Sequence, residues 1–199
     1  MTAAGIASPS AGRTAGRLQT IVIIVIALIV VGTLAYVATG PGAVDGVTKV
    51  ELTGAIAGKV PAPGDIPPAF TAITSDGTQV SLADYAGKPL WLTFGASWCP
   101  DCRSEAPDVE ATYEKYKVQG LNVLGVFISE SATDIGGYRT RAGLTFPIVV
   151  DENTTIASAY QTLGIPTHYF IGADGRIVEV RIGALSRADM DRAAAALVN

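Results

Sequence analysis

Apolar runs of strand length alternate with longer mixed segments of helix length in the last two thirds of the chain. Residues 90–94 and 121–129 are nearly continuous apolar runs, the pattern of strands buried on both faces of a sheet. Between them, residues 100–119 predict a helix that ends at Gly120 and is kinked at Pro107. This order of strand, helix and strand indicates an α/β fold.

The rest of this region also divides into short elements. Residues 70–74 and 79–82 flank a turn at 75–78 and predict a hairpin. The other predicted elements are a helical turn at 83–89, a helix at 132–142, an extended piece at 147–150, a helix ending near Tyr160, strands at 167–171 and 177–182, and a helix at 187–198. The chain thus finishes in a hairpin and a helix, which predicts a central mixed sheet with helices on both faces.

An uncharged apolar run near the N-terminus predicts a membrane anchor. Residues 21–38 are mostly Ile, Val, Leu and Ala, and a bilayer core needs about 20 such residues. Arginines precede the run and acidic residues follow it, so the tail at 1–20 is expected in the cytoplasm and the remainder outside. A cleaved signal peptide is the alternative, although its apolar region should be only about 7–15 residues long. Both interpretations place the rest of the chain outside the cytoplasm.

Composition limits the function further. The net charge of −4 and the lack of a basic run argue against nucleic acid as a partner. Residues 39–62 are rich in Gly, Ala and Pro and predict a linker, which leaves 63–199 as one domain with enough residues for a core. Two cysteines cannot make a multi-bridge scaffold, and a bridge between them closes too short a loop to stabilise much.

The only two cysteines, Cys99 and Cys102, are spaced as C-x-x-C between a predicted strand and a predicted helix. At a helix N-terminus, backbone N–H groups and the helix dipole favour a thiolate, which is the species that attacks disulfides. The spacing keeps a second thiol close enough to resolve a mixed disulfide. The pattern therefore predicts thiol–disulfide exchange, with Cys99 attacking and Cys102 resolving.

Three alternatives use the same cysteines. A closed zinc site needs four ligands, whereas copper(I) accepts two soft ones and could add the distant His168. A plain stapling disulfide is the structural alternative. A peroxidatic site is disfavoured, because the peroxiredoxin pattern wants Pro and Ser or Thr where this chain has Leu92 and Ala96.

Two separated segments resemble the TlpA/ResA-like branch of the thioredoxin superfamily. Residues 92–107, which contain the C-x-x-C motif, resemble its active-site segment, and Gly-Ile-Pro-Thr-His-Tyr-Phe-Ile at 164–171 resembles its second signature. The turn at 173–178 resembles the hairpin that follows. The similarity covers about residues 63–199 and implies a thioredoxin-like fold in a membrane-tethered oxidoreductase on the outer side of a bacterial membrane.

The resemblance implies roles for five further residues. Pro166 would be a cis-proline that faces the disulfide, and the backbone of Ile165 would be left to pair with an extended substrate. Thr167, after the proline, would also belong to the substrate-binding residues. Trp98 would border the nucleophile and shape the docking surface. Glu105 lies three residues after Cys102 on the same helix face and would relay protons. The alternatives are an ordinary loop proline, a core tryptophan and a solvated helix charge.

Departures from related patterns affect the chemistry. Thioredoxin has a buried Asp six positions ahead of the first cysteine, where this chain has Thr93, so Glu105 or water must accept protons. Asp101 in the spacer places a negative charge beside the thiols, which disfavours the thiolate and predicts a reducing couple. We interpret His168 as a strand residue with a satisfied hydrogen bond, although it could titrate near the site.

These observations predict an extracytoplasmic disulfide reductase on a single bacterial membrane anchor, with a redox-active Cys99–Cys102 disulfide and no cofactor or metal. By resemblance, its substrates are disulfide-containing exported proteins such as apocytochromes or proteins of copper-site assembly, and a membrane electron donor re-reduces it. Two alternatives from other classes are a copper(I)-binding assembly protein and a non-catalytic tethered binding module.

Overall fold

The computed structural model describes residues 13–39, 50–53 and 58–199, in two units that divide after Gly46. The first unit contains helix α1 (Arg13–Thr39), whose side chains are described from residue 20 to 33 and are exposed there. Among the described residues, no helix combines the length and the apolar character that a membrane span needs. The anchor predicted at 21–38 is therefore not supported by the structure, and parts of the predicted tail and linker lie outside the described residues.

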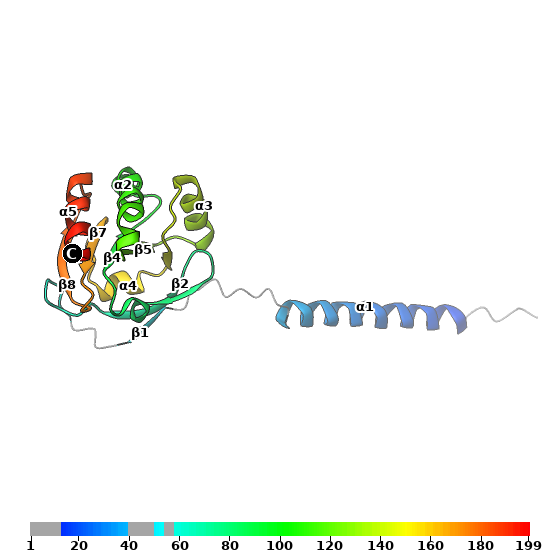
Figure 1. Ribbon diagram of the computed structural model, residues 1–199. Coiled ribbons are helices and arrows are strands. Elements are labelled where there is room, and N and C mark those ends of the chain that lie inside the picture. The colour runs from blue at the N-terminus through cyan, green and yellow to red at the C-terminus, as the bar shows by residue number, and fades with distance from the viewer. Residues whose placement is uncertain (1–12, 40–49, 54–57) are drawn as a thin grey trace, which may run out of the picture. The chain divides into compact units, whose positions relative to one another are not determined.

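The second unit is built on a mixed sheet of five strands in the order β6-β5-β4-β7-β8 (Figure 1). The three strands β4, β5 and β6 are parallel, whereas β7 runs antiparallel to β4 and β8 antiparallel to β7. The strands are β4 (Leu90–Gly95), β5 (Asn122–Ile128), β6 (Ile148–Asp151), β7 (Thr167–Ile171) and β8 (Ile177–Ile182). All six residues of β4 are buried, as expected for a central strand covered on both faces.

Two apolar layers cover the sheet (Figure 1). On one face lie α2 (Pro100–Tyr116), α3 (Ala132–Ala142) and α5 (Arg187–Val198). On the other lie α4 (Thr155–Ala159) and a small antiparallel sheet of β1 (Glu51–Thr53), β2 (Ala69–Ile73) and β3 (Gln79–Ser81). The small sheet joins the large one at β6, where the Ser75 N–H donates to the Ile148 carbonyl at 2.8 Å.

The thioredoxin-like α/β fold with a mixed sheet is confirmed, and the elements predicted from residue 70 onward are present. The predicted helix 100–119 continues through Pro107 but ends as α2 at Tyr116, followed by a 3-10 turn and Gly120 at φ 98°. Strand β1 was not predicted and lies inside the predicted linker 39–62. It forms because Leu52 pairs with Phe70 across β1 and β2 and packs on the core, a long-range contact that a Gly-rich sequence does not indicate.

The turn of the β2–β3 hairpin holds a carboxylate that stabilises it. Asp76 accepts a hydrogen bond from the Thr74 hydroxyl at 2.6 Å and from the Thr78 N–H at 3.2 Å, and pairs with Arg139 at 3.2 Å. These bonds, the Thr74 hydroxyl first, lower the pKa of Asp76 to about 2. The hairpin therefore gains stability from the charged form of this side chain.

Replacing Asp76 with Asn should lower the free energy of unfolding at pH 7 by about 0.5–1 kcal/mol, because solvent screens a half-exposed charge. A lowered pKa stabilises the fold above the unfolded-state pKa, near 3.8, and this contribution is lost as pH falls toward about 2. Urea unfolding at pH 7, 5 and 3 should therefore show the gap between wild type and variant closing at the lowest pH. A gap that stays constant would show that the charge is not its cause.

Candidate active site

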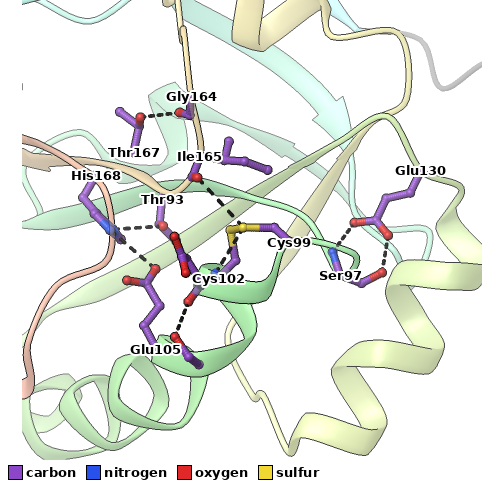
Figure 2. The surroundings of a disulfide bond; sticks show 12 residues. Thr93, Ser97, Cys99, Cys102, Glu105, Glu130, Gly164, Ile165, Thr167 and His168 are labelled. Atoms are coloured by element: carbon purple, nitrogen blue, oxygen red, sulfur yellow. Dashed lines mark hydrogen bonds and ion pairs between the residues drawn. A yellow bond between two sulfur atoms is a disulfide. The ribbon is translucent and has the colours of Figure 1, made fainter.

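Cys99 and Cys102 form a disulfide at the N-terminus of α2 (Figure 2). Strand β4 ends at Gly95 and a short loop leads to Cys99, which caps α2, with Pro100 as the first helical residue. The Cys102 N–H donates to the Cys99 Sγ at 3.2 Å. The predicted position of Cys99 between a strand and a helix is confirmed. That this N–H and the helix N-terminus favour a Cys99 thiolate in the reduced protein remains a prediction.

The disulfide is more enclosed than a freely exposed nucleophile would be. Cys99 is 4% exposed and Cys102 6%, and both pack with Ala96 and the side chain of Ile165. The Ile165 carbonyl oxygen lies 3.9 Å from the Cys99 Sγ. A disulfide sulfur has no proton, so this contact becomes a hydrogen bond only when Cys99 is a thiol. A substrate must therefore reach Cys99 past the Ile165 loop.

The loop that faces the disulfide contains a cis peptide bond between Ile165 and Pro166, as the resemblance implied. Pro166 is buried, while Ile165 is half-buried. Thr167 is also buried, and its hydroxyl donates to the Gly164 carbonyl at 2.7 Å. Its hydroxyl is thus used within the loop, where it fixes the backbone that presents Ile165 to Cys99 (Figure 2).

Trp98 precedes Cys99 and is 54% exposed, so it is not a core residue. This exposure agrees with the predicted place of Trp98 on the surface beside the nucleophile, and its part in docking remains a prediction. The loop that carries it is held from the other side by the Glu130 carboxylate, which accepts from the Ser97 N–H at 2.6 Å and from the Ser97 hydroxyl (Figure 2). Asp101 is exposed in the first turn of α2.

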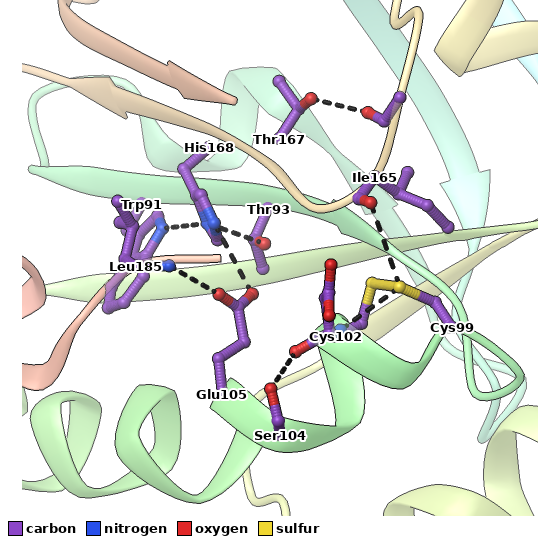
Figure 3. Close-up of polar contacts among 12 residues, drawn as sticks. Trp91, Thr93, Cys99, Cys102, Ser104, Glu105, Ile165, Thr167, His168 and Leu185 are labelled. Carbon is purple, nitrogen blue, oxygen red and sulfur yellow. Dashed lines mark hydrogen bonds and ion pairs between the residues drawn. A yellow bond between two sulfur atoms is a disulfide. The ribbon is translucent and has the colours of Figure 1, made fainter. Parts of the chain in front are cut away.

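Glu105 is a buried acid rather than a solvated helix charge. It is 6% exposed, and its Oε2 accepts from the Leu185 N–H at 3.1 Å. Its Oε1 lies 3.5 Å from the Nε2 of His168, which is fully buried (Figure 3). Glu105 lies about one helical turn after Cys102 on α2, and its carboxylate is held there between His168 and the Leu185 N–H.

His168 therefore has a more specific environment than a plain strand histidine. Its Nδ1 lies 3.3 Å from the Trp91 Nε1 and 3.1 Å from the Thr93 Oγ1 (Figure 3). The register explains the cluster, because Thr93 lies directly opposite His168 across β4 and β7, and Trp91 is two residues away on the same face. Thr93 and His168 were each considered from the sequence, but no local pattern indicates that they meet across the sheet.

The copper(I) alternative needs His168 near the two sulfurs with a free nitrogen. Instead, His168 contacts Glu105, Trp91 and Thr93. In the part of the chain that the structure describes, no group of three or more His, Cys, Asp or Glu side chains is arranged to hold a metal ion. The peroxidatic alternative also finds no polar partners, because the Leu92 and Ala96 side chains are fully buried and apolar.

Comparisons with known proteins agree with this site. The chain is 33% identical over 129 residues to the thiol-disulfide oxidoreductase ResA of Geobacillus kaustophilus, which covers 65% of this chain and 74% of the relative. A thiol:disulfide interchange protein of the thioredoxin family from Chlorobium tepidum has a similar structure, with a TM-score of 0.62 and 30% identity over 72% of this chain and all of that one. A secreted Mycobacterium tuberculosis disulfide oxidoreductase, homologous to E. coli DsbE, matches with a TM-score of 0.60 and 26% identity over 64% of this chain and 96% of that one.

The fold, the disulfide at the start of α2 and these relatives define a thioredoxin-like thiol–disulfide oxidoreductase. Residues 63–180, more than half of the chain, match the AhpC/TSA family, and the chain belongs to this family. The resemblance to TlpA/ResA-like oxidoreductases is thereby confirmed.

Proposed function

We propose that this oxidoreductase is an extracytoplasmic disulfide reductase that acts on disulfide-containing exported proteins, apocytochromes among them. The observation that carries the redox chemistry is the Cys99–Cys102 pair, in which the Cys99 Sγ accepts the Cys102 N–H at 3.2 Å and lies 3.9 Å from the Ile165 carbonyl oxygen. Asp101 supports the proposal that the protein reduces its substrates. Its negative charge lies beside the thiols and disfavours the thiolate, which makes the dithiol a stronger reductant.

The proposed reaction moves two electrons from the dithiol to the substrate. The Cys99 thiolate attacks a substrate disulfide, which forms a mixed disulfide and releases one substrate thiolate that takes a proton from water. Cys102 then gives its proton to Glu105, and its thiolate attacks the Cys99 Sγ. The second substrate sulfur leaves as a thiolate, and the protein is left as the Cys99–Cys102 disulfide. A membrane electron donor must then return two electrons and two protons.

The location is a separate part of the proposal and rests on the sequence. The uncharged run at 21–38, with arginines before it, is expected to anchor the chain and leave the oxidoreductase domain outside the cytoplasm. The similar disulfide oxidoreductase from Mycobacterium tuberculosis is a secreted protein, which supports an extracytoplasmic location for this chain. The test is to reduce intact cells, treat them with a membrane-impermeant maleimide and isolate this protein. Because the chain has only two cysteines, the maleimide should be found on Cys99 and Cys102. Labelling only after lysis would contradict the location.

The equilibrium redox potential of the full chain tests the direction. Titration against dithiothreitol buffers, with the reduced fraction followed by thiol alkylation, should give a value near or below about −270 mV. A value near about −120 mV would instead describe an oxidant, and the proposed reductase would be wrong while the residues and the fold stood. Replacing Asp101 with Asn should move the potential to a less reducing value, because it removes the charge beside the thiols.

A further inference from the structure

His168 is the one histidine of the chain, and the exchange reaction above does not use it. It is fully buried on β7, yet it contacts three polar side chains that come from β4 and α2. Burying an imidazole costs free energy unless each of its ring nitrogens meets a group of the opposite hydrogen-bonding role, a donor facing an acceptor. Its proton arrangement can therefore be worked out from its partners.

The partners of Nδ1 fix the tautomer. The Trp91 indole N–H can only donate, so the Nδ1 at 3.3 Å must accept from it. The Thr93 hydroxyl at 3.1 Å can add a second donor to the same nitrogen. The proton of the neutral ring is then on Nε2, which points at the Glu105 Oε1 3.5 Å away. Within the described part of the chain this Nε2 has no hydrogen-bond partner, and the Glu105 carboxylate is the acceptor that it faces.

Two N–H groups thus converge on the Glu105 carboxylate, those of His168 and of Leu185. Both N–H groups can donate to the carboxylate oxygens, and together they hold the carboxylate in one orientation. The other charged and titratable groups around the pair are unchanged in any His168 variant. They are Cys102 and Arg103 on α2, Arg181 opposite His168 on β8, Asp189 near Arg181 at the start of α5, and Tyr138 on α3, which interacts electrostatically with Glu105, Glu130 and Arg103.

We propose that His168, locked by Trp91 and Thr93, is a positioning residue that holds the Glu105 carboxylate in place, so that Glu105 can take the proton of Cys102 during resolution. This inference rests on the proposed function. Thioredoxin's buried Asp is replaced here by Thr93, and the structure assigns the missing proton acceptor to a His168–Glu105 pair on the neighbouring strand and helix. The proton passes from the Cys102 Sγ to a Glu105 oxygen, while the sulfur electrons form the new bond to Cys99 and the substrate thiolate leaves.

Two substitutions by neutral amide side chains separate positioning from packing. In His168→Gln the amide nitrogen reaches about as far as Nε2 and can still donate to Glu105. In His168→Asn the shorter amide stays at the level of Nδ1, near Trp91 and Thr93, and loses that reach. Neither side chain titrates, so a difference between them reports the contact with Glu105.

The assay is a single turnover of the reduced full chain with the chromogenic disulfide dithiobis-nitrobenzoate. Attack by Cys99 releases a first coloured thiolate and leaves the second on Cys99, and attack by Cys102 releases it. In His168→Asn the pH midpoint of the second release should rise by about one unit, since the acid loses a donor, with about a tenfold slower release below that midpoint. In His168→Gln, which keeps the donor to Glu105 but loses the acceptor at the level of Nδ1, the midpoint should rise clearly less than in His168→Asn, and the pH dependence of the first release should be unchanged in both.

Glu105→Gln is the test of the route. In this background His168→Asn should cause no further shift, because the acid through which it acts is gone. Equal shifts in the Asn and Gln variants, a shift that persists with Glu105→Gln, or no shift would each overturn the proposal. If His168→Asn does not fold, Thr93→Val is the second test, because it removes only the hydroxyl contact to Nδ1. It should shift the midpoint of the second release in the same direction and by less. No shift in Thr93→Val would then overturn the proposal. A wild type with no first release would overturn the proposed function itself.

Discussion

Replacing Cys99 with serine is expected to abolish disulfide reduction, with a fall in rate on the order of a thousandfold or more. The serine hydroxyl occupies nearly the same volume but stays protonated at neutral pH and cannot form a mixed disulfide. The contacts around Cys99 are local, from the Cys102 N–H and the Ile165 loop, so the fold should be retained. Single-turnover release of a chromogenic thiolate measures the loss, and thermal unfolding checks the fold.

Cys102→Ser is the matched control, because it removes the other sulfur of the same disulfide. It should still attack through Cys99 and release the first thiolate, and then stop as a mixed disulfide. In cells it should accumulate covalent adducts with substrates, which a reducing agent releases and mass spectrometry can identify. If Cys99→Ser retained activity, or if Cys102→Ser lost the first release while Cys99→Ser kept it, the assigned order of attack would be wrong.

Local patterns in the sequence were enough to place the cysteines. The C-x-x-C motif, the apolar run before it and the helix after it all lie within about thirty residues, and their geometry follows from secondary structure alone. The cis-proline loop came from a resemblance and not from local physics, since any loop proline can be trans. The hairpins were predicted from turn residues at fixed spacing, and their strands begin and end within one residue of the predicted bounds.

The surroundings of the cysteines depend on contacts that no local pattern carries. Thr93 and His168 are far apart in sequence and meet only because β7 pairs antiparallel with β4 in one register. A shift by one residue would turn His168 to the other face of the sheet, away from Glu105. Ser97 and Glu130 meet in the same way, across the ends of β4 and β5. A search for polar residues predicted to face each other on adjacent central strands would have indicated the first of these clusters.

The largest expected effect on stability comes from Tyr160, which sits between the small sheet and the central sheet. Its ring is fully buried, with centroids 5.0 Å from Phe94, 5.2 Å from Tyr169 and 6.3 Å from Phe70. Its hydroxyl donates to the Pro68 carbonyl at 2.9 Å, and burial raises its pKa well above the ordinary value. One side chain thus joins β2, β4 and β7, and the last of these leads from the loop that faces the disulfide.

Tyr160→Ala should lower the free energy of unfolding by about 3–5 kcal/mol, because it removes a buried aromatic ring and leaves a cavity that three rigid rings cannot fill. Such a loss is a large share of the roughly 5–15 kcal/mol that holds a domain folded. Tyr160→Phe keeps the ring and leaves the Pro68 carbonyl without its donor, and should cost about 1–2 kcal/mol. Urea unfolding followed by tryptophan fluorescence measures both changes.

Tyr113→Ala is the matched control for Tyr160→Ala, because it removes a tyrosine side chain that is less buried. Tyr113 is half-buried on α2 and has one aromatic neighbour, Phe146, at 6.2 Å, so its removal should cost clearly less than that of Tyr160. If Tyr160→Ala cost no more than Tyr113→Ala, the aromatic cluster would not be what holds the small sheet to the domain. If it costs the expected amount, the added β1–β3 sheet is part of the cooperative fold, because the same ring packs against β2 and against the two central strands that place Cys99 and the cis-proline loop.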